Sequence, residues 1–263
     1  MEYVLITGAY GGMGRATAKA LAAQGYGVFA LDKCVGEAEE RIFPVQADVT
    51  DSESLQRAFE TVRAVTEKLY AIVHFAGIYM LDSLVEMADE EFEKIFAINV
   101  YGAFYINKIF LPMLQDGGRI LLTTSELAPL DPLPFTGVYA VTKAALDKYA
   151  YSLRMELQLL GISVSVLRAG AVSTGMLGVS TAALDRFCEK TQTYQCNAER
   201  FKKIVCGVEA KSVPPEKIAA KAAKILKTKK PKFAYSVNRN GLLLLLNALP
   251  QSWQFGIIKK ILK

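Results

Sequence analysis

The residues best suited to chemistry in this chain are Tyr139 and Lys143, in the run Tyr-Ala-Val-Thr-Lys, with Ser125 fourteen residues upstream. Residues four apart on a helix lie on one face, so this spacing predicts an ammonium beside a phenol. A phenol titrates near pH ~10 in water, and a close positive charge lowers that pKa by favouring the phenolate. With a hydroxyl to hold the substrate oxygen, such a set can pass a proton while an alcohol and a ketone interconvert.

The N-terminal sequence indicates where a hydride carrier would bind. Residues 3–6 form a short apolar run, residues 7–14 are rich in glycine, and a helix-like run follows from Arg15 to Gln24. This order is typical of a dinucleotide-binding turn, where amides at a helix N-terminus hold a pyrophosphate. Asp32 ends the next apolar run, where a carboxylate binds ribose hydroxyls and repels a 2′-phosphate. The sequence therefore favours NAD, with Arg15 and Lys33 nearby to accept NADP as the alternative.

Through these residues the chain resembles the short-chain dehydrogenase/reductase family, from about residue 3 to about residue 235. The family's Thr-Gly-x-x-x-Gly-x-Gly turn matches residues 7–14, and its Tyr-x-x-x-Lys matches Tyr139 and Lys143. The resemblance implies that Ser125 holds the substrate oxygen and that Asn99 anchors a water linking the lysine to solvent. The implied catalytic set is Asn99, Ser125, Tyr139 and Lys143.

The match departs from the family pattern in three places. The family's Asn-Asn-Ala-Gly appears as His74-Phe75-Ala76-Gly77, and its Pro-Gly appears as Ala169-Gly170. The family's serine and tyrosine are more often thirteen residues apart, so Thr124 or a one-residue insertion is the alternative to Ser125. We expect His74, the sole histidine, to be structural rather than catalytic.

The resemblance also implies which residues surround the cofactor. Asp48 matches a carboxylate on the adenine side, although it also reads as a helix cap, and Thr174 matches a threonine that contacts the nicotinamide amide. The predicted cofactor site is Thr7, Gly8, Tyr10, Gly11, Gly12, Met13, Gly14, Asp32, Asp48, Val49, Ala76, Gly77, Asn99, Tyr139, Lys143, Gly170, Val172 and Thr174. The four cysteines lack Cys-x-x-Cys spacing, so we expect no metal site.

Short apolar runs alternate with longer amphipathic stretches, the pattern of an α/β fold with a parallel sheet. We expect a Rossmann-type doubly wound sheet in a single domain, residues 1–263. Expected strands lie at 3–6, 27–31, 42–46, 70–74, 118–123 and 162–167, and helices at 13–24, 52–67, 89–115, 137–160 and 215–227. Ligands of such sheets bind beyond the carboxyl ends of the strands, where Asp32, Gly77, Ser125 and Gly170 fall.

Two segments interrupt this alternation. Residues 175–212 resemble the family's substrate lid, and their apolar residues at helical spacing form either core or an apolar wall that excludes water. Residues 240–263 contain five consecutive leucines, Leu242 to Leu246, followed by a lysine-rich end. This apolar run is shorter than the roughly 20 residues that span a bilayer. It is either a buried helix or subunit contact, or an interfacial membrane anchor.

Together these features predict an NAD(P)-dependent oxidoreductase, similar to hydroxysteroid dehydrogenases, that interconverts a secondary alcohol and a ketone on a bulky, apolar, steroid-like or lipid-like substrate. A 3-oxoacyl-thioester reductase and a non-catalytic dinucleotide-sensing protein are the alternatives. The chain has 52% hydrophobic residues and no signal-like start, so we expect a cytoplasmic enzyme, which is membrane-associated if the tail is an anchor. Its net charge of +5 is modest, and we expect it to bind no nucleic acid. The resemblance implies a homodimer or homotetramer formed through the long helices near 89–115 and 137–160.

Overall fold

The computed structural model describes the backbone of residues 1–263 and the side chains of residues 1–175, 182–208 and 210–263. Its strands are β1 (Tyr3–Thr7), β2 (Gly27–Asp32), β3 (Ile42–Gln46), β4 (Leu69–His74), β5 (Leu114–Ser125), β6 (Ser163–Ala169) and β7 (Ala234–Val237). They form one parallel sheet in the order β3-β2-β1-β4-β5-β6-β7. This confirms the predicted doubly wound α/β fold.

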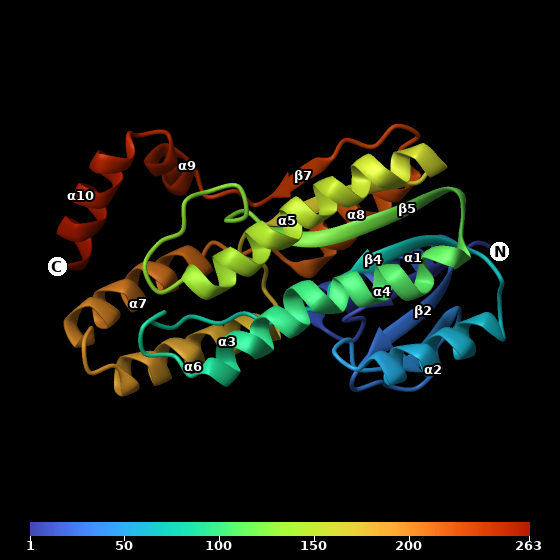
Figure 1. Cartoon of the computed structure of the whole chain (residues 1–263), viewed down its shortest axis with the longest axis horizontal. Helices are drawn as coiled ribbons and strands as arrows, with labels where there is room; N and C mark the ends of the chain where they lie inside the picture. Colours follow the sequence, from blue (N-terminus) through green and yellow to red (C-terminus); the bar gives the residue numbers. More distant parts are fainter.

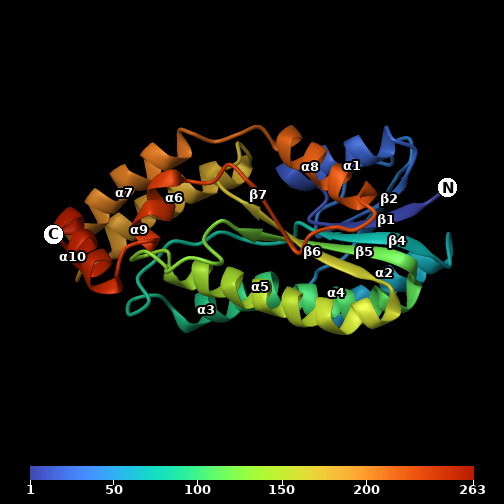
Figure 2. The same ribbon diagram turned by 90° about the horizontal axis from the view of Figure 1, so that it is seen from above.

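Helices lie on both faces of this sheet (Figure 2). They are α1 (Gly12–Ala22), α2 (Ser52–Arg63), α3 (Asp89–Phe96), α4 (Gly102–Phe110), α5 (Gly137–Leu157), α6 (Gly175–Lys190), α7 (Gln195–Glu209), α8 (Pro215–Lys227), α9 (Gly241–Asn247) and α10 (Gln251–Leu262). Helices α1 and α8 pack on one face, and α2, α4 and α5 pack on the other. A parallel sheet requires this arrangement, because its crossover helices return over one face or the other.

The core is divided by the sheet into two clusters, and β1 shows why. Its central residues Val4, Leu5 and Ile6 are all fully buried. Leu5 packs with the α2, α4 and α5 side, whereas Val4 and Ile6 pack with the α1 and α8 side. Successive side chains of a strand point to opposite faces, so a strand buried on both sides must be apolar at every position. Burying each such side chain contributes about 1.5–3 kcal/mol.

The helix expected at 89–115 is the main correction to the predicted elements. It is interrupted by a π-helical turn at Ala97–Tyr101, and α4 ends at Phe110. Leu111–Met113 then form a 3-10 turn containing Pro112, and β5 begins at Leu114, four residues before the expected strand. Proline cannot continue a helix beyond its first turn, which explains the stop. By length and composition Asp89–Met113 could cross a membrane, yet here it packs against α5 and α2.

Four helices of the C-terminal third lie at the carboxyl end of the sheet, whereas α8 packs beside α1 on one face of the sheet. Figure 1 shows α6, α7, α9 and α10 at the end of the molecule opposite the N-terminus. Helix α10 packs on α7, and Asn197 donates a hydrogen bond to the carbonyl of Leu262 at 2.6 Å. The expected lid, 175–212, thus consists of α6, α7 and their connections, and residues 176–181 and 209 of that prediction lie outside the described side chains. Strand β7, which was not predicted, leads into α9.

Candidate active site

Ser125, Tyr139 and Lys143 meet at the end of β5, as the sequence predicted. Ser125 is the last residue of β5, and Tyr139 and Lys143 lie in the first two turns of α5. A hydrogen bond joins the Tyr139 hydroxyl to Ser125. The Lys143 ammonium lies 5.6 Å from the centre of the Tyr139 ring and donates to the Thr123 carbonyl at 3.3 Å. Thr124 instead bonds Asp147 at 3.3 Å, so the geometry favours Ser125 over its neighbour.

The pKa values of this pair correct one expectation. Burial raises the pKa of Tyr139 to about 12, and the hydrogen bond with Ser125 only partly opposes that rise. Burial lowers the pKa of Lys143 to about 8. We expected the lysine to lower the pKa of the phenol, but burial of the phenolate sets the direction of the shift in this structure, and the group that opposes it is Ser125. Tyr139 therefore keeps its proton at neutral pH and is ready to donate it.

Asn99 lies beside Lys143, in the π-helical turn at Ala97–Tyr101. Its side chain accepts from the Ile78 amide at 2.8 Å and donates to the Ile78 carbonyl at 3.0 Å and to Thr142 at 3.1 Å. A Cβ on Gly77 would lie 3.1 Å from Asn99 Oδ1 and 3.3 Å from Lys143 Nζ. Asn99 thus fixes the loop after β4 around the lysine, and π-helical turns are frequent at functional sites.

The glycine turn packs tightly against the neighbouring strand ends. Gly8 has φ +65°, and a Cβ there would lie 2.5 Å from the Ala76 nitrogen. A Cβ on Gly12 would lie 2.5 Å from Cγ2 of Thr174, so the turn reaches the loop after β6. Helix α1 starts at Gly12 with neither a side-chain cap nor an acidic residue in its first turn. Its first amides are therefore suited to an anion such as a pyrophosphate.

Two carboxylates lie where the adenosine half of a dinucleotide was predicted. Asp32 accepts from the amides of Tyr10 at 2.9 Å and Lys33 at 2.8 Å. Asp48 accepts from both the amide and the hydroxyl of Thr50 and pairs with Lys33 at 2.9 Å, and these contacts lower its pKa to about 2. The cap of α2 is Asp51, so the competing interpretation of Asp48 as that cap is wrong.

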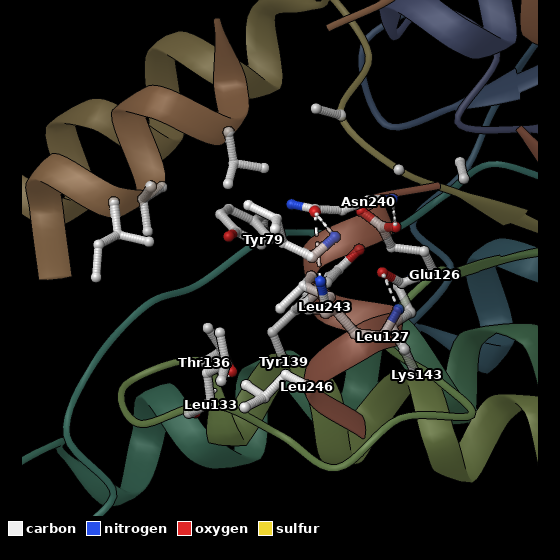
Figure 3. A pocket seen from close by; sticks show the side chains of 18 of the residues that line it. Tyr79, Glu126, Leu127, Leu133, Thr136, Tyr139, Lys143, Asn240, Leu243 and Leu246 are labelled. Carbon is white, nitrogen blue, oxygen red and sulfur yellow. Dashed lines mark hydrogen bonds between the residues drawn. The ribbon is translucent and has the colours of Figure 1, made fainter. Parts of the chain in front are cut away.

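The catalytic groups open onto an apolar cavity of about 530 Å³ (Figure 3). From the predicted site, Met13, Gly77, Ser125, Tyr139, Lys143, Gly170, Val172 and Thr174 line it. Phe201 and Val205 of the lid line the same cavity, and Phe201 also belongs to a small core cluster with Leu184, so the lid is both wall and core. Leucines and isoleucines of α9 and α10 complete the wall. Val49, by contrast, packs against Gly102.

Glu126 is an acidic lining residue that was not predicted from the sequence. It follows Ser125, is 9% exposed, and accepts a hydrogen bond from the Asn240 amide at 2.6 Å (Figure 3). A Cβ on Gly170 would lie 3.0 Å from its Oε1. Burial raises its pKa, while the Asn240 bond and the Arg239 charge oppose that rise. Its only signal in the sequence is an acidic residue directly after the predicted catalytic serine.

His74 is a buried structural residue. Its Nε2 lies 2.9 Å from Oδ1 of Asn107, and burial lowers its pKa to about 4, so the ring is neutral at physiological pH. His74 is the last residue of β4, the central strand of the sheet, and does not line the cavity. Among the described side chains, no group of three His, Cys, Asp or Glu residues could hold a metal ion.

The fold and the site define a nicotinamide-dependent dehydrogenase or reductase. The uncapped α1 terminus, the glycine cradle and the Asp32 carboxylate fit a dinucleotide. A family model for short chain dehydrogenases matches residues 2–185, and the chain belongs to that family. The relatives that match this chain include a dehydrogenase and a ketone reductase.

Relatives and solved structures agree with this assignment. The chain is 35% identical to estradiol 17-beta-dehydrogenase 2 of Mus musculus, over 66% of this chain and 49% of that protein, so it spans about half of that relative's length. It is 26% identical to 3-ketodihydrosphingosine reductase of Bacteroides thetaiotaomicron, over 96% of this chain and 93% of that protein. The fold matches 3-ketoacyl-(acyl-carrier-protein) reductase from Brucella melitensis complexed with NADH, with a TM-score of 0.73, 22% identity and coverage of 90% of this chain and 96% of that one.

Proposed function

We propose that this protein is an NAD-preferring oxidoreductase that interconverts a ketone and a secondary alcohol on a bulky, lipid-like substrate. The observation that carries the proposal is the position of Ser125 and Tyr139 against an apolar cavity of about 530 Å³. That volume lies within the ~300–1,000 Å³ typical of sites for drug-sized ligands. A cavity with few polar groups favours a substrate that is mainly hydrocarbon around one reacting oxygen.

Reduction follows from the positions of three side chains. When bound, the reduced nicotinamide supplies the hydride that the carbonyl carbon accepts. Ser125 and Tyr139 hold the carbonyl oxygen, and Tyr139 transfers its proton to that oxygen as the alcohol forms. Lys143 binds the nicotinamide ribose and returns a proton to Tyr139 from the side of Asn99. Oxidation runs through the same contacts in reverse.

The preference for NAD is supported by the charges around Asp32. Of the two cations that could accept a 2′-phosphate, Arg15 is paired with Glu39 and Lys33 is paired with Asp48. Arg15 also lies over the ring of Tyr10, with 5.2 Å between the guanidinium carbon and the ring centre. A 2′-phosphate would meet the Asp32 carboxylate while both cations already have partners, so like-charge repulsion disfavours NADP.

Glu126 refines the substrate class. Its Oε2 accepts from the Asn240 amide, and Glu126 lines the cavity next to Ser125. A carboxylate beside the reacting oxygen favours a substrate with an ammonium or hydroxyl group near the ketone, because a buried charge needs a partner. Of the two named relatives, the 3-ketodihydrosphingosine reductase aligns along nearly the whole chain, which supports a long-chain amino ketone over a steroid.

We also propose a homodimer or homotetramer in the cytoplasm. The described surface of α4, α5 and the π-helical turn between α3 and α4 exposes large apolar side chains, with Phe104 43%, Tyr151 52% and Met155 50% exposed. A second copy on these helices would bury them. Light scattering of the purified protein tests this, and a monomer at micromolar concentration would contradict it.

The test of the function is a panel assay that follows the absorbance of the reduced nicotinamide. The panel contains a long-chain 2-amino-3-ketone, a steroid ketone, a 3-oxoacyl thioester and a short-chain ketone, each with NADH and NADPH. Turnover of the amino ketone with NADH supports the proposal. Preference for the thioester with NADPH would indicate a fatty-acid reductase instead. Cofactor binding without turnover of any ketone would indicate a dinucleotide sensor.

A further inference from the structure

The C-terminal helices expose a row of large apolar side chains. On α10, Trp253 is 63%, Ile257 36% and Ile261 54% exposed, and residues four apart lie on one helix face. On α9, Leu242 is 75% and Leu245 is 63% exposed. These five residues are called the outer face here. Figure 1 shows α9 and α10 at the edge of the molecule, away from the sheet.

The outer face also surrounds the entrance to the cavity. Leu242, Leu245, Ile257 and Ile261 line the cavity while remaining exposed, so they form its rim. Their neighbours Leu246 and Leu262 point inward, and Leu262 is 8% exposed. The same two short helices thus form the inner wall of the cavity and the apolar surface around its mouth.

The charged residues within the C-terminal segment itself have one sign. Residues 239–263 contain four basic residues (Arg239, Lys259, Lys260 and Lys263) and no acidic residue. Among the described side chains none of these four forms an ion pair. Such a surface complements an anionic one, whereas two copies of this segment would bring like charges together. The helices have seven and twelve residues, too short to span a bilayer but suited to lie in its interface.

We propose that α9 and α10 dock on an anionic lipid surface through the outer face, so that the cavity opens toward the bilayer. A lipid-like substrate then enters from the membrane without crossing water. This entry route rests on the proposed function, but the docking itself does not. A second copy of the chain is the competing occupant of the outer face.

Trp253 provides a direct probe, because it is the sole tryptophan of the chain. The full-length protein is mixed with vesicles of phosphatidylcholine, with or without phosphatidylglycerol, and fluorescence and co-sedimentation are measured. We expect a blue shift and sedimentation only with anionic vesicles, both decreasing as salt rises. An unshifted spectrum with no sedimentation would overturn the proposal. A blue-shifted dimer in the absence of lipid would also overturn it, in favour of a second copy.

Two pairs of variants separate the apolar and the charged contributions. Trp253→Ser should abolish sedimentation with anionic vesicles, while Leu159→Ser, which changes an 82% exposed residue in the 3-10 turn after α5, should not. Lys259→Gln with Lys260→Gln should weaken vesicle binding by roughly 30-fold, since each lysine near an anionic surface contributes about 1 kcal/mol. Lys229→Gln with Lys230→Gln, an exposed pair beyond α8, is the matched control. Equal losses in a test pair and its control would contradict a defined docking face.

The activity assay separates failure of the docking from failure of the function. Vesicle binding is measured without substrate, so it can succeed even if no ketone of the panel turns over. Turnover of a soluble ketone without vesicle binding would leave the function standing and remove the docking. We expect Trp253→Ser to turn over a soluble short-chain ketone normally and a vesicle-embedded long-chain ketone at least several-fold more slowly.

Discussion

The Glu126 carboxylate accepts a hydrogen bond from the Asn240 amide, with 2.6 Å between Oε2 and the nitrogen. Glu126 directly follows the catalytic strand β5, and Asn240 caps α9 by accepting from the amides of Leu242 and Leu243. One hydrogen bond therefore connects the end of β5 to the start of the C-terminal segment. Glu126 also lines the cavity.

Glu126→Gln separates these two roles, because the amide oxygen still accepts from Asn240 while the charge is removed. We expect the KM for a long-chain amino ketone to rise about tenfold or more, since hydrogen bonds to charged groups contribute about 1.5–3 kcal/mol. The KM for the same ketone without the amine should change little. Equal effects on both substrates would show that Glu126 only holds the C-terminal segment.

Tyr139→Phe removes the hydroxyl that donates the proton. We expect kcat to fall by about 10²–10⁴, the usual contribution of general acid–base catalysis, while NADH affinity stays near normal. Turnover and a fluorescence titration of NADH measure the two quantities. Tyr151→Phe, on the exposed side of the same helix, is the control. Near-normal turnover in Tyr139→Phe would refute the proposed mechanism.

The pH dependence of kcat/KM for reduction should follow the ionisation of the Lys143 ammonium. The pKa of Tyr139 is about 12, so its proton is present throughout the usual range, whereas the pKa of Lys143 is about 8. The profile of kcat/KM reports the free enzyme. We therefore expect kcat/KM for reduction to be level below pH about 8 and to fall above it, as Lys143 loses its charge. A profile that stays level well above that pH would contradict the assignment.

His74 should make the protein sensitive to acid. Its pKa is about 4 in the folded protein and 6.5 in the unfolded chain, so below pH 6.5 the unfolded state binds a proton that the folded state excludes. Its full contribution is present above pH 6.5, and about 3 kcal/mol is lost as the pH falls to about 4. The difference in unfolding free energy between wild type and His74→Asn measures this. An NMR titration of the sole imidazole with a pKa near 6.5 would refute it.

Cofactor preference can be tested at the adenosine end. Asp32→Ser removes the carboxylate that would repel a 2′-phosphate, and Glu39→Gln frees Arg15 to bind one. We expect each change to raise kcat/KM for NADPH relative to that for NADH. The double variant should shift this ratio by about 100-fold, because it removes a negative charge close to the 2′-phosphate of NADPH and frees a positive charge to bind it. A wild-type preference for NADPH would contradict the role given to Asp32.

Several features of the fold and site were predictable because their signal is local. A strand buried on both faces, such as β1, can be recognised in the sequence as an apolar run. Tyr139 and Lys143 are four residues apart, which places them on one face of α5, one helical turn from each other. The π-helical turn at Ala97–Tyr101 was not predictable, because one extra residue per turn barely changes helical periodicity. Strand β7 was missed because its four residues, half-buried at the sheet edge, lack a clear apolar pattern.

Other features depend on contacts between distant parts of the chain. The raised pKa of Tyr139 results from tertiary burial, which helical spacing does not reveal. The position of Glu126 depends on Asn240, 114 residues later, returning to the end of β5. The residues near the reacting oxygen were therefore predictable from the sequence, whereas the polar group proposed to distinguish one ketone from another was not.

The separation between β5 and the α9–α10 segment has an evolutionary consequence. The proton-transfer residues lie on β5 and α5, whereas much of the cavity wall comes from residues 241–263, which follow the last strand of the sheet. Replacement of this terminal stretch by recombination or mutation would change which molecules enter without altering the catalytic residues. The apolar part of the cavity wall that α9 and α10 supply is thus encoded separately from the proton-transfer residues, whereas Glu126 is encoded beside Ser125.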